Sequence, residues 1–199
     1  DGMALVFAAP AEARAQILRS AARQFEEGDV QHWWHPPAGA GVRTRITDDL
    51  YFLPFVTCQY VATTGDAALL DERVPFLHAP VLRPEQEEEY GLPDVSDLTG
   101  TVYEHCVQAL EHGLKLGPHG LPLMGTGDWN DGMNQVGAGG QGESVWNGWF
   151  MLATLREFAS LAEQRRDAAR VAWCRERAEA LRRALEEHAW DGGWYRRAY

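Results

Sequence analysis

The chain has 199 residues, of which 45% are hydrophobic and 24% are charged, and its formal net charge is −11. These values are those of an ordinary globular protein, and the length is enough for one domain with a sizeable core. The acidic balance argues against nucleic-acid backbones and anionic membrane surfaces as partners, but it leaves room for a small anion held by a local pair of arginines.

Apolar residues recur at helical spacing in several long segments. They predict helices over residues 11–26, 50–62, 99–116, 144–162 and 165–189. Residues 3–9 form a short apolar run, and residues 75–97, rich in Pro and Glu, indicate a solvated connection. No segment alternates with period two over a useful length, so a sheet is not evident. The predicted fold class is therefore all-α, a helical scaffold whose connecting loops carry the polar and aromatic side chains.

The first of these loops, residues 29–37, holds two indoles and two imidazoles, and its prolines predict an irregular segment. His32 and His35 could suggest a metal pair, but no third ligand lies at a recognisable spacing. We therefore expect no metal site.

A second polar group precedes the helix at residues 50–62. Asp48 and Asp49 suit the start of a helix, where a carboxylate caps backbone N–H groups and complements the helix dipole. Capping does not explain Arg43 and Arg45, which come just before. We predict that Arg43, Arg45 and Asp49 converge at this helix start and hold a sugar hydroxyl or a phosphate.

The most unusual stretch is the loop at residues 127–134. Two carboxylates, two carboxamides and an indole fall within seven residues, Asp128 to Asn134, and no apolar periodicity explains them. Such clusters are also common in solvated turns. The residue pattern does not fit a calcium-binding EF-hand, and the glycine-rich run at 137–142 lacks the Lys-Ser/Thr ending of a phosphate-binding P-loop.

Charged and amide groups beside an aromatic ring suggest recognition of a polyhydroxylated ligand. Asp128, Trp129 and Asn130 are accordingly predicted to bind substrate, which leaves a carboxyl group for acid chemistry. The chain contains eight Trp, and an indole face stacks readily on the C–H face of a sugar ring.

Cys58, Cys106 and Cys174 show no Cys-x-x-Cys spacing, and their contexts are apolar. Free, buried thiols in a reducing compartment are therefore expected. No segment has the length of a transmembrane helix, and no signal peptide is visible. We expect a cytoplasmic location, either for a stand-alone enzyme or for the cytosolic part of a larger membrane-associated synthase. The chain begins without Met, and we interpret it as an excerpt from a longer polypeptide.

Three motifs in the same order resemble the inverting β-glucoside phosphorylases of the glycoside hydrolase 94 family. They are the segments Gly-Asp-Val-Gln-His-Trp-Trp-His-Pro at 28–36, Val-Arg-Thr-Arg-Ile-Thr-Asp-Asp-Leu at 42–50 and Gly-Asp-Trp-Asn-Asp-Gly-Met-Asn at 127–134. The residues of the first and third motifs most resemble those of the phosphorylase domains of cyclic β-1,2-glucan synthases and of 1,2-β-oligoglucan phosphorylases. The resemblance extends from about residue 24 to residue 150.

The resemblance implies an (α/α)6 barrel, of which residues 1–199 would be one fragment, inactive on its own. It implies that Asp131 is the general acid and that Arg43 and Asp49 hold the non-reducing glucosyl unit. Inorganic phosphate is then the co-substrate, a β-glucan or β-glucoside is the substrate, and no cofactor is needed. The remaining partner would be the rest of the polypeptide, including the family's phosphate-binding His and Thr-Gly.

Two other functions remain open on the sequence. An inverting β-glucoside hydrolase on the same fold would use Asp131 as the acid and a second carboxylate, such as Glu143, as the base that activates water. A non-catalytic carbohydrate-binding helical domain would keep the aromatic contacts and tolerate the loss of Asp131.

Overall fold

The computed structural model describes residues 2–199, which divide into two compact units. Within the described residues, unit 1 comprises residues 2–45 and Phe52–His112, and unit 2 comprises Ile46–Tyr51 and Gly113–Tyr199. Helix α3, Asp49–Thr64, contributes its first three residues to unit 2 and the rest to unit 1.

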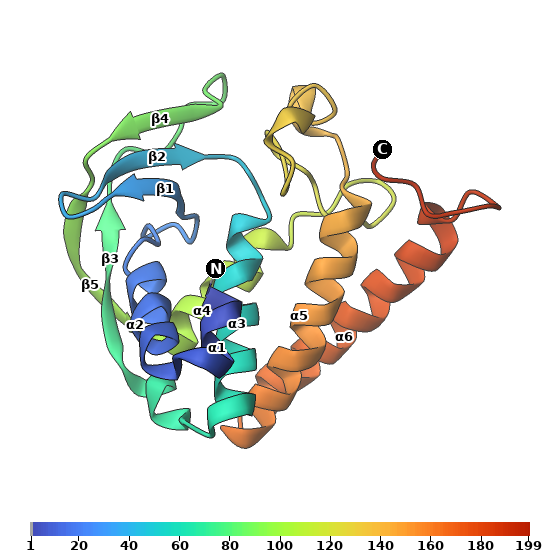
Figure 1. Cartoon of the computed structure of the whole chain (residues 1–199). Coiled ribbons are helices and arrows are strands. Elements are labelled where there is room, and N and C mark those ends of the chain that lie inside the picture. Colours follow the sequence, from blue (N-terminus) through green and yellow to red (C-terminus); the bar gives the residue numbers. More distant parts are fainter. Residues whose placement is uncertain (1) are drawn as a thin grey trace. The chain divides into compact units, whose positions relative to one another are not determined.

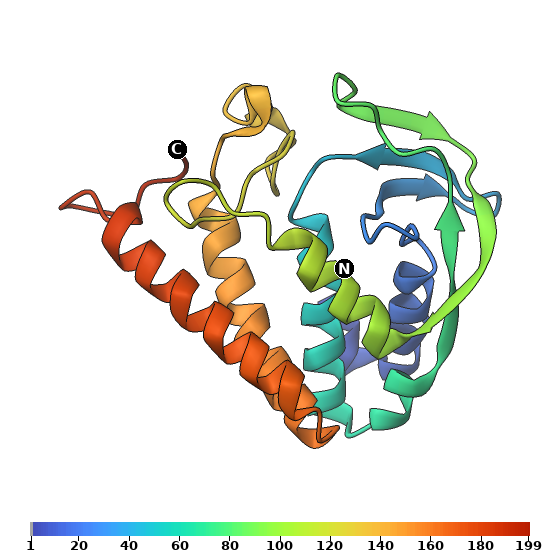
Figure 2. The same cartoon turned by 180° about the vertical axis from the view of Figure 1, so that it is seen from behind.

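Unit 1 begins with two short helices that pack together, α1 (Gly2–Ala8) and α2 (Pro10–Ala21). Pro10 occupies the first turn of α2, where its missing N–H costs nothing. A 3₁₀ turn at Ala67–Asp71 follows α3, and α4 (Val102–Gly113) closes the unit; Figure 2 shows α4 continuing directly from the strand before it. The buried residues of α2 and α4 include Ala13, Ile17, Cys106 and Leu110, as helical spacing predicts.

The expectation of an all-α chain is wrong, because unit 1 also contains two antiparallel sheets (Figure 1). One has the order β1-β2-β4, from Gln31–His35, Ala40–Thr44 and Glu88–Gly91. The other pairs β3 (Arg73–His78) with β5 (Asp94–Thr101). The segments expected to be a loop (29–37) and a solvated connection (75–97) therefore contain strands.

These strands lack the alternation that reveals a half-buried strand. All four residues of β4 are exposed, and most of β5 is exposed as well. In β2 the last four residues are all buried, including an arginine, so its pattern is continuous rather than alternating.

Unit 2 is built on two long helices that lie side by side in both views, α5 (Val145–Gln164) and α6 (Ala168–Ala184). Ser144 caps α5 by accepting a hydrogen bond from the backbone N–H of Asn147, and Asp167 caps α6 in the same way through Arg170. A π-helical turn, Leu185–Ala189, extends α6. Both helices begin within three residues of their predicted starts. The core between them includes Leu155, Phe158, Leu181 and Leu185.

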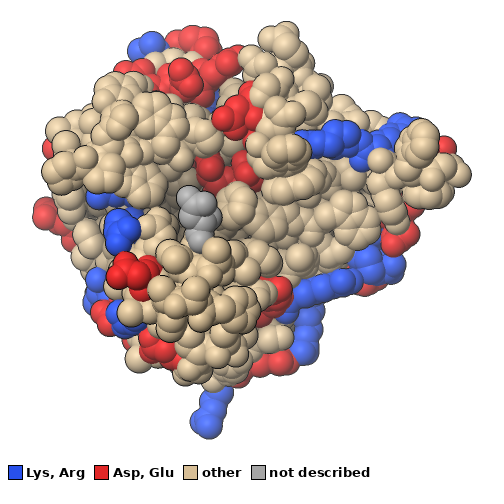
Figure 3. All heavy atoms as spheres, viewed as in Figure 1, with Lys and Arg blue, Asp and Glu red and all other residues tan. Residues whose placement is uncertain are grey.

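The loop at residues 127–134 has a short 3₁₀ turn, Asp131–Met133, and a second one follows at Ala138–Gly140. All three cysteines are free and buried, as predicted. Figure 3 shows acidic side chains gathered over β4 and basic ones along α6. Within residues 2–199, no helix has both the length and the apolar character needed to cross a membrane.

Candidate active site

Asp128 is a fully buried carboxylate that anchors the central loop. It forms an ion pair with Arg197 at 2.5 and 2.7 Å and accepts a hydrogen bond from the hydroxyl of Ser144 at 2.6 Å. The backbone N–H of Asn130 donates to it as well, at 3.1 Å. Burial by itself raises the pKa of Asp128, but these donors outweigh it and hold the pKa below its ordinary value. Asp128 is thus an ionised anchor for the loop.

Asp131 lies three residues further on, in a different setting. It is exposed and opens the 3₁₀ turn, which Asn130 caps by accepting a hydrogen bond from the N–H of Gly132 at 3.1 Å. Trp129 is 57% exposed, and its indole lies 6.2 Å from that of Trp146. The loop therefore presents a carboxyl group and an indole on its surface while its base is fixed by Asp128.

The start of α3 is tied to the same loop within unit 2. The hydroxyl of Thr47 donates to the carbonyl of Met124 at 3.0 Å, and its backbone N–H donates to Gly127 at 3.1 Å. The side chain of Asn147, from α5, donates to Thr47 at 2.7 Å. Asp49 begins α3 two residues after Thr47, so the segments that carry Asp49 and Asp131 are hydrogen-bonded to one another. Their joint contact with a glucosyl unit stays a prediction.

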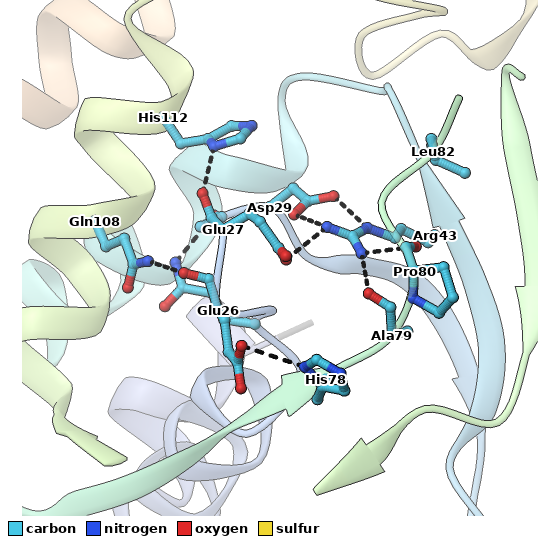
Figure 4. Close-up of polar contacts among 12 residues, drawn as sticks. Glu26, Glu27, Asp29, Arg43, His78, Ala79, Pro80, Leu82, Gln108 and His112 are labelled. Carbon is cyan, nitrogen blue, oxygen red and sulfur yellow. Dashed lines mark hydrogen bonds and ion pairs between the residues drawn. The ribbon is translucent and has the colours of Figure 1, made fainter. Parts of the chain in front are cut away.

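Arg43 lies in β2 of unit 1 and is only 4% exposed. Its Nε and one Nη donate to the carboxylate of Asp29 at 2.7 and 2.6 Å, and that Nη also donates to Glu27 at 2.9 Å. The other Nη donates to the carbonyls of Ala79 and Pro80, both at 3.1 Å (Figure 4). These acceptors match the five N–H groups of a guanidinium. A sugar or phosphate would have to replace one of them to bind Arg43 directly, and the predicted contact remains untested.

Arg45, two residues further on, also donates hydrogen bonds to the segment after β3, residues 79–86. Its guanidinium donates to the backbone carbonyls of Leu82 at 3.1 Å, Arg83 at 2.9 Å and Gln86 at 2.9 Å. Arg43 in β2 and Arg45 just after it therefore fix the 79–86 loop through five of its carbonyl oxygens. The substrate contact predicted for Arg45 likewise remains untested.

Sequence reasoning missed Arg197, which is 69 residues from its partner Asp128. The last residues of the chain pair with residues 143–145, with Val145 donating to the carbonyl of Arg197 and Glu143 to that of Tyr199. This pairing brings Arg197 beside the loop, and no motif could have signalled it. Glu27 and Asp29 were also missed as partners of Arg43, although Asp29 lies within the first motif and Glu27 directly before it.

Glu143 has a structural role in the turn that precedes the central loop. It is 1% exposed, and it accepts hydrogen bonds from the backbone N–H groups of His119 at 3.0 Å and Leu121 at 3.2 Å. The imidazole of His119 forms a further contact with its carboxylate. Glu143 thus braces the turn before the central loop.

The whole chain, residues 1–199, matches the model of the glycosyl hydrolase 94 superfamily catalytic domain. The chain belongs to this family.

Its relatives include one glucan synthase and several sugar phosphorylases. The chain is 52% identical over 200 residues to the cyclic beta-(1,2)-glucan synthase NdvB of Rhizobium meliloti, and the match covers 100% of the chain. It is 32% identical over 203 residues to the solabiose phosphorylase of Paenibacillus borealis and 31% identical over 205 residues to the cellobionic acid phosphorylase of Neurospora crassa, covering 100% and 99% of the chain. The chain spans 7% of the length of the first relative and 23% of each of the other two.

Proposed function

We propose that this chain carries the general acid of an inverting glycoside phosphorylase that acts on a β-linked glucan. In this reaction Asp131 donates its proton to the departing glycosidic oxygen, and the bond between that oxygen and the anomeric carbon breaks. A phosphate oxygen forms a new bond to the anomeric carbon from the opposite face of the ring. The products are α-glucose 1-phosphate and a glucan shortened by one unit.

The observation that carries this proposal is the difference in burial between the two aspartates of one loop, Asp128 and Asp131. Asp128 is buried and engaged by charge-assisted hydrogen bonds, so it is unsuited to giving up or taking a proton. Asp131 is exposed beside an exposed indole, where a sugar could stack and bring its glycosidic oxygen near the carboxyl group.

A phosphorylase needs fewer catalytic side chains than a hydrolase. An inverting hydrolase requires a carboxylate base to activate water, whereas phosphate is already a nucleophile. Glu143, the base considered for a hydrolase, is buried and braces a turn. An exposed carboxyl group on the loop, with Glu143 buried, therefore supports phosphorolysis better than hydrolysis.

The choice of a β-1,2-linked glucan is supported by the similarity to a cyclic beta-(1,2)-glucan synthase along the full chain. The phosphorylase relatives act, by their names, on solabiose and on cellobionic acid. These differences in substrate suggest that the linkage is selected by parts of the site that vary among relatives. The (α/α)6 barrel, to which the helices described here would contribute one part, belongs to the same proposal.

The test is Asp131→Asn in the complete protein, which keeps the shape of the side chain and removes its proton. General acid catalysis is typically worth about 10²–10⁴-fold, so phosphorolysis of a natural β-glucan should fall by about that factor. A β-glucoside whose leaving group needs no protonation, such as a dinitrophenyl glucoside, should be affected far less. Equal rates of the variant and the native enzyme on the natural glucan would refute the role of Asp131.

A further inference from the structure

The C-terminal stretch, residues 195–199, pairs with the segment that leads into α5, and both belong to unit 2. Glu143 and Tyr199 exchange backbone hydrogen bonds at 3.0 and 2.9 Å, and the backbone N–H of Val145 donates to the carbonyl of Arg197 at 3.3 Å. In both views the C-terminal stretch accordingly lies beside the start of α5 (Figure 1, Figure 2). This pairing decides which side chain of the stretch reaches the central loop.

Tyr199 fixes the register of the pairing. Its ring stacks on the imidazole of His119, with the ring centroids 4.0 Å apart and an interplanar angle of 22°, and its hydroxyl donates to the backbone carbonyl of His188. A slip by one residue would break both contacts and would put Arg196 or Ala198 where Arg197 now lies. The position of Arg197 is therefore specified by contacts made elsewhere in the stretch.

Arg197 joins the C-terminal stretch to the central loop. Its two Nη groups donate to the two carboxylate oxygens of Asp128 at 2.7 and 2.5 Å, which is the two-point geometry that suits a guanidinium and a carboxylate. The same guanidinium lies over the ring of Trp129, 6.0 Å from its centroid. Arg197 thus contacts two consecutive residues of the loop from one side.

Two further hydrogen bonds extend this link from Asp128 to Asp131. Asp128 accepts from the backbone N–H of Asn130, and the side chain of Asn130 accepts from the backbone N–H of Gly132, both at 3.1 Å. Asp131 lies between these two residues, at the start of the 3₁₀ turn. The backbone of Asp131 is therefore held on both sides by a series of hydrogen bonds that begins at Arg197.

We propose that Arg197 is a positioning residue for the reaction, which orients the carboxyl group of Asp131 through Asp128 and does not itself contact the reacting atoms. The inference rests on the proposed function, since an oriented acid matters only where it transfers a proton. A displacement of about 1 Å in a catalytic group can lower a rate by about 10²-fold. Loss of Arg197 should therefore slow the reactions that need the proton of Asp131 and spare those that do not.

The experiment compares Arg197→Met with Arg196→Met in the complete protein. Arg196 is the adjacent residue of the same stretch; it is exposed, and its guanidinium lies over the ring of Tyr199, 5.1 Å from its centroid. The two variants thus remove the same positive charge one residue apart, and the first also removes the ion pair with Asp128. Arg197→Lys is the conservative variant, because it keeps the charge and loses the two-point geometry.

Each variant is assayed on a β-1,2-linked glucan, whose leaving group needs a proton, and on a dinitrophenyl glucoside, whose leaving group needs none. Arg197→Met should lower kcat/KM about 10- to 100-fold for the glucan and less than about threefold for the dinitrophenyl glucoside. Arg197→Lys should lie between Arg197→Met and the native enzyme on the glucan. Arg196→Met should stay within about twofold of the native enzyme on both substrates.

A second comparison introduces Arg197→Met into the Asp131→Asn variant. Because a positioning residue acts only through the acid that it positions, the double variant should be less than about twofold slower on the glucan than Asp131→Asn alone. A general loss of stability would not produce this non-additivity. Melting curves check that each variant is folded, and Arg197→Lys carries the same comparisons if Arg197→Met fails to fold.

Equal losses on the two substrates, or additive effects of Arg197→Met and Asp131→Asn on the glucan, would overturn the proposal. So would a folded Arg197→Met variant that is as active on the glucan as Arg196→Met. Each of these results leaves the role of Asp131 standing. If Asp131→Asn alone left the rate on the glucan unchanged, the proposed function and the positioning role of Arg197 would both fail.

Discussion

Asp128 and Asp131 lie three residues apart on one loop, but their surroundings differ: Asp128 is buried and Asp131 is exposed. A buried carboxylate is costly unless charged partners and hydrogen bonds compensate it, and Asp128 receives both from Arg197 and Ser144. Asp131 has no such requirement because it is exposed. The sequence singled out the loop, and the chemistry predicted for it stays a prediction. It could not show that Asp128 anchors the loop, since that depends on Arg197 and the folded C-terminal segment.

This contrast predicts different stability effects of two matched substitutions. Asp128→Asn keeps the shape but loses the charge that pairs with Arg197, and it should lower the free energy of unfolding by about 2 kcal/mol at pH 7. Asp131→Asn should change it by less than about 0.5 kcal/mol. Urea denaturation of the complete protein, followed by tryptophan fluorescence, measures the change in the free energy of unfolding for both variants. Equal effects would contradict the anchoring role.

The effect of Asp128→Asn should also depend on pH. The folded-state pKa of Asp128 lies below its ordinary value, so its ionised form stabilises the fold fully above the unfolded pKa of about 3.9. That contribution is lost as pH falls through the lower, folded-state pKa. The stability difference between native and variant protein should therefore be constant from pH 7 to about pH 5 and shrink toward zero in stronger acid. A difference that persists unchanged at pH 2 would point to packing rather than charge.

At the scale of elements, the β1–β2–β4 sheet is the feature that sequence analysis failed to predict. Strand β4 lies within residues 75–97, for which the sequence predicts a solvated connection because they are rich in Pro and Glu. Strand β2 is not predicted because its residues do not alternate, and only the structure shows that Arg43 is buried against two carboxylates. The long helices were predictable because α5 and α6 have clear starts and apolar stripes that pack against each other.

Two glycines of the sheet, Gly41 and Gly91, lie opposite each other in the register of β2 and β4. Gly41 can be tested by substitution, and Gly91 serves as its control. A Cβ at Gly41 would lie 2.1 Å from the carbonyl oxygen of Trp33 and 2.8 Å from the Cα of Trp34, whereas a Cβ at Gly91 would have no neighbour within 4 Å. Gly41→Ala should therefore destabilise the protein by about 1–3 kcal/mol through a backbone clash.

Gly91→Ala should be nearly neutral, within about 0.5 kcal/mol. Urea denaturation followed by tryptophan fluorescence compares the two, because Trp33 and Trp34 lie in the strand that Gly41 contacts. If both variants changed the free energy of unfolding by similar amounts, the close approach of Gly41 to β1 would have little energetic importance.

At the scale of the whole molecule, membership of the glycoside hydrolase 94 family is established by the match over residues 1–199. The three motifs that suggested it lie in both units: the first in unit 1, the third in unit 2, and the second across both. A resemblance carried by short motifs can identify a family without revealing its sheets, because the residues of these motifs do not follow strand periodicity. The cytoplasmic location and the barrel remain predictions.

The most direct test of the central claim is the phosphate dependence of the complete protein acting on a β-1,2-linked glucan, followed by ³¹P and ¹H NMR. With inorganic phosphate present, the account predicts that α-glucose 1-phosphate accumulates as the first product. Without phosphate, almost no free glucose should appear. Rapid release of glucose in phosphate-free buffer, or a first phosphorylated product in the β configuration, would contradict inverting phosphorolysis.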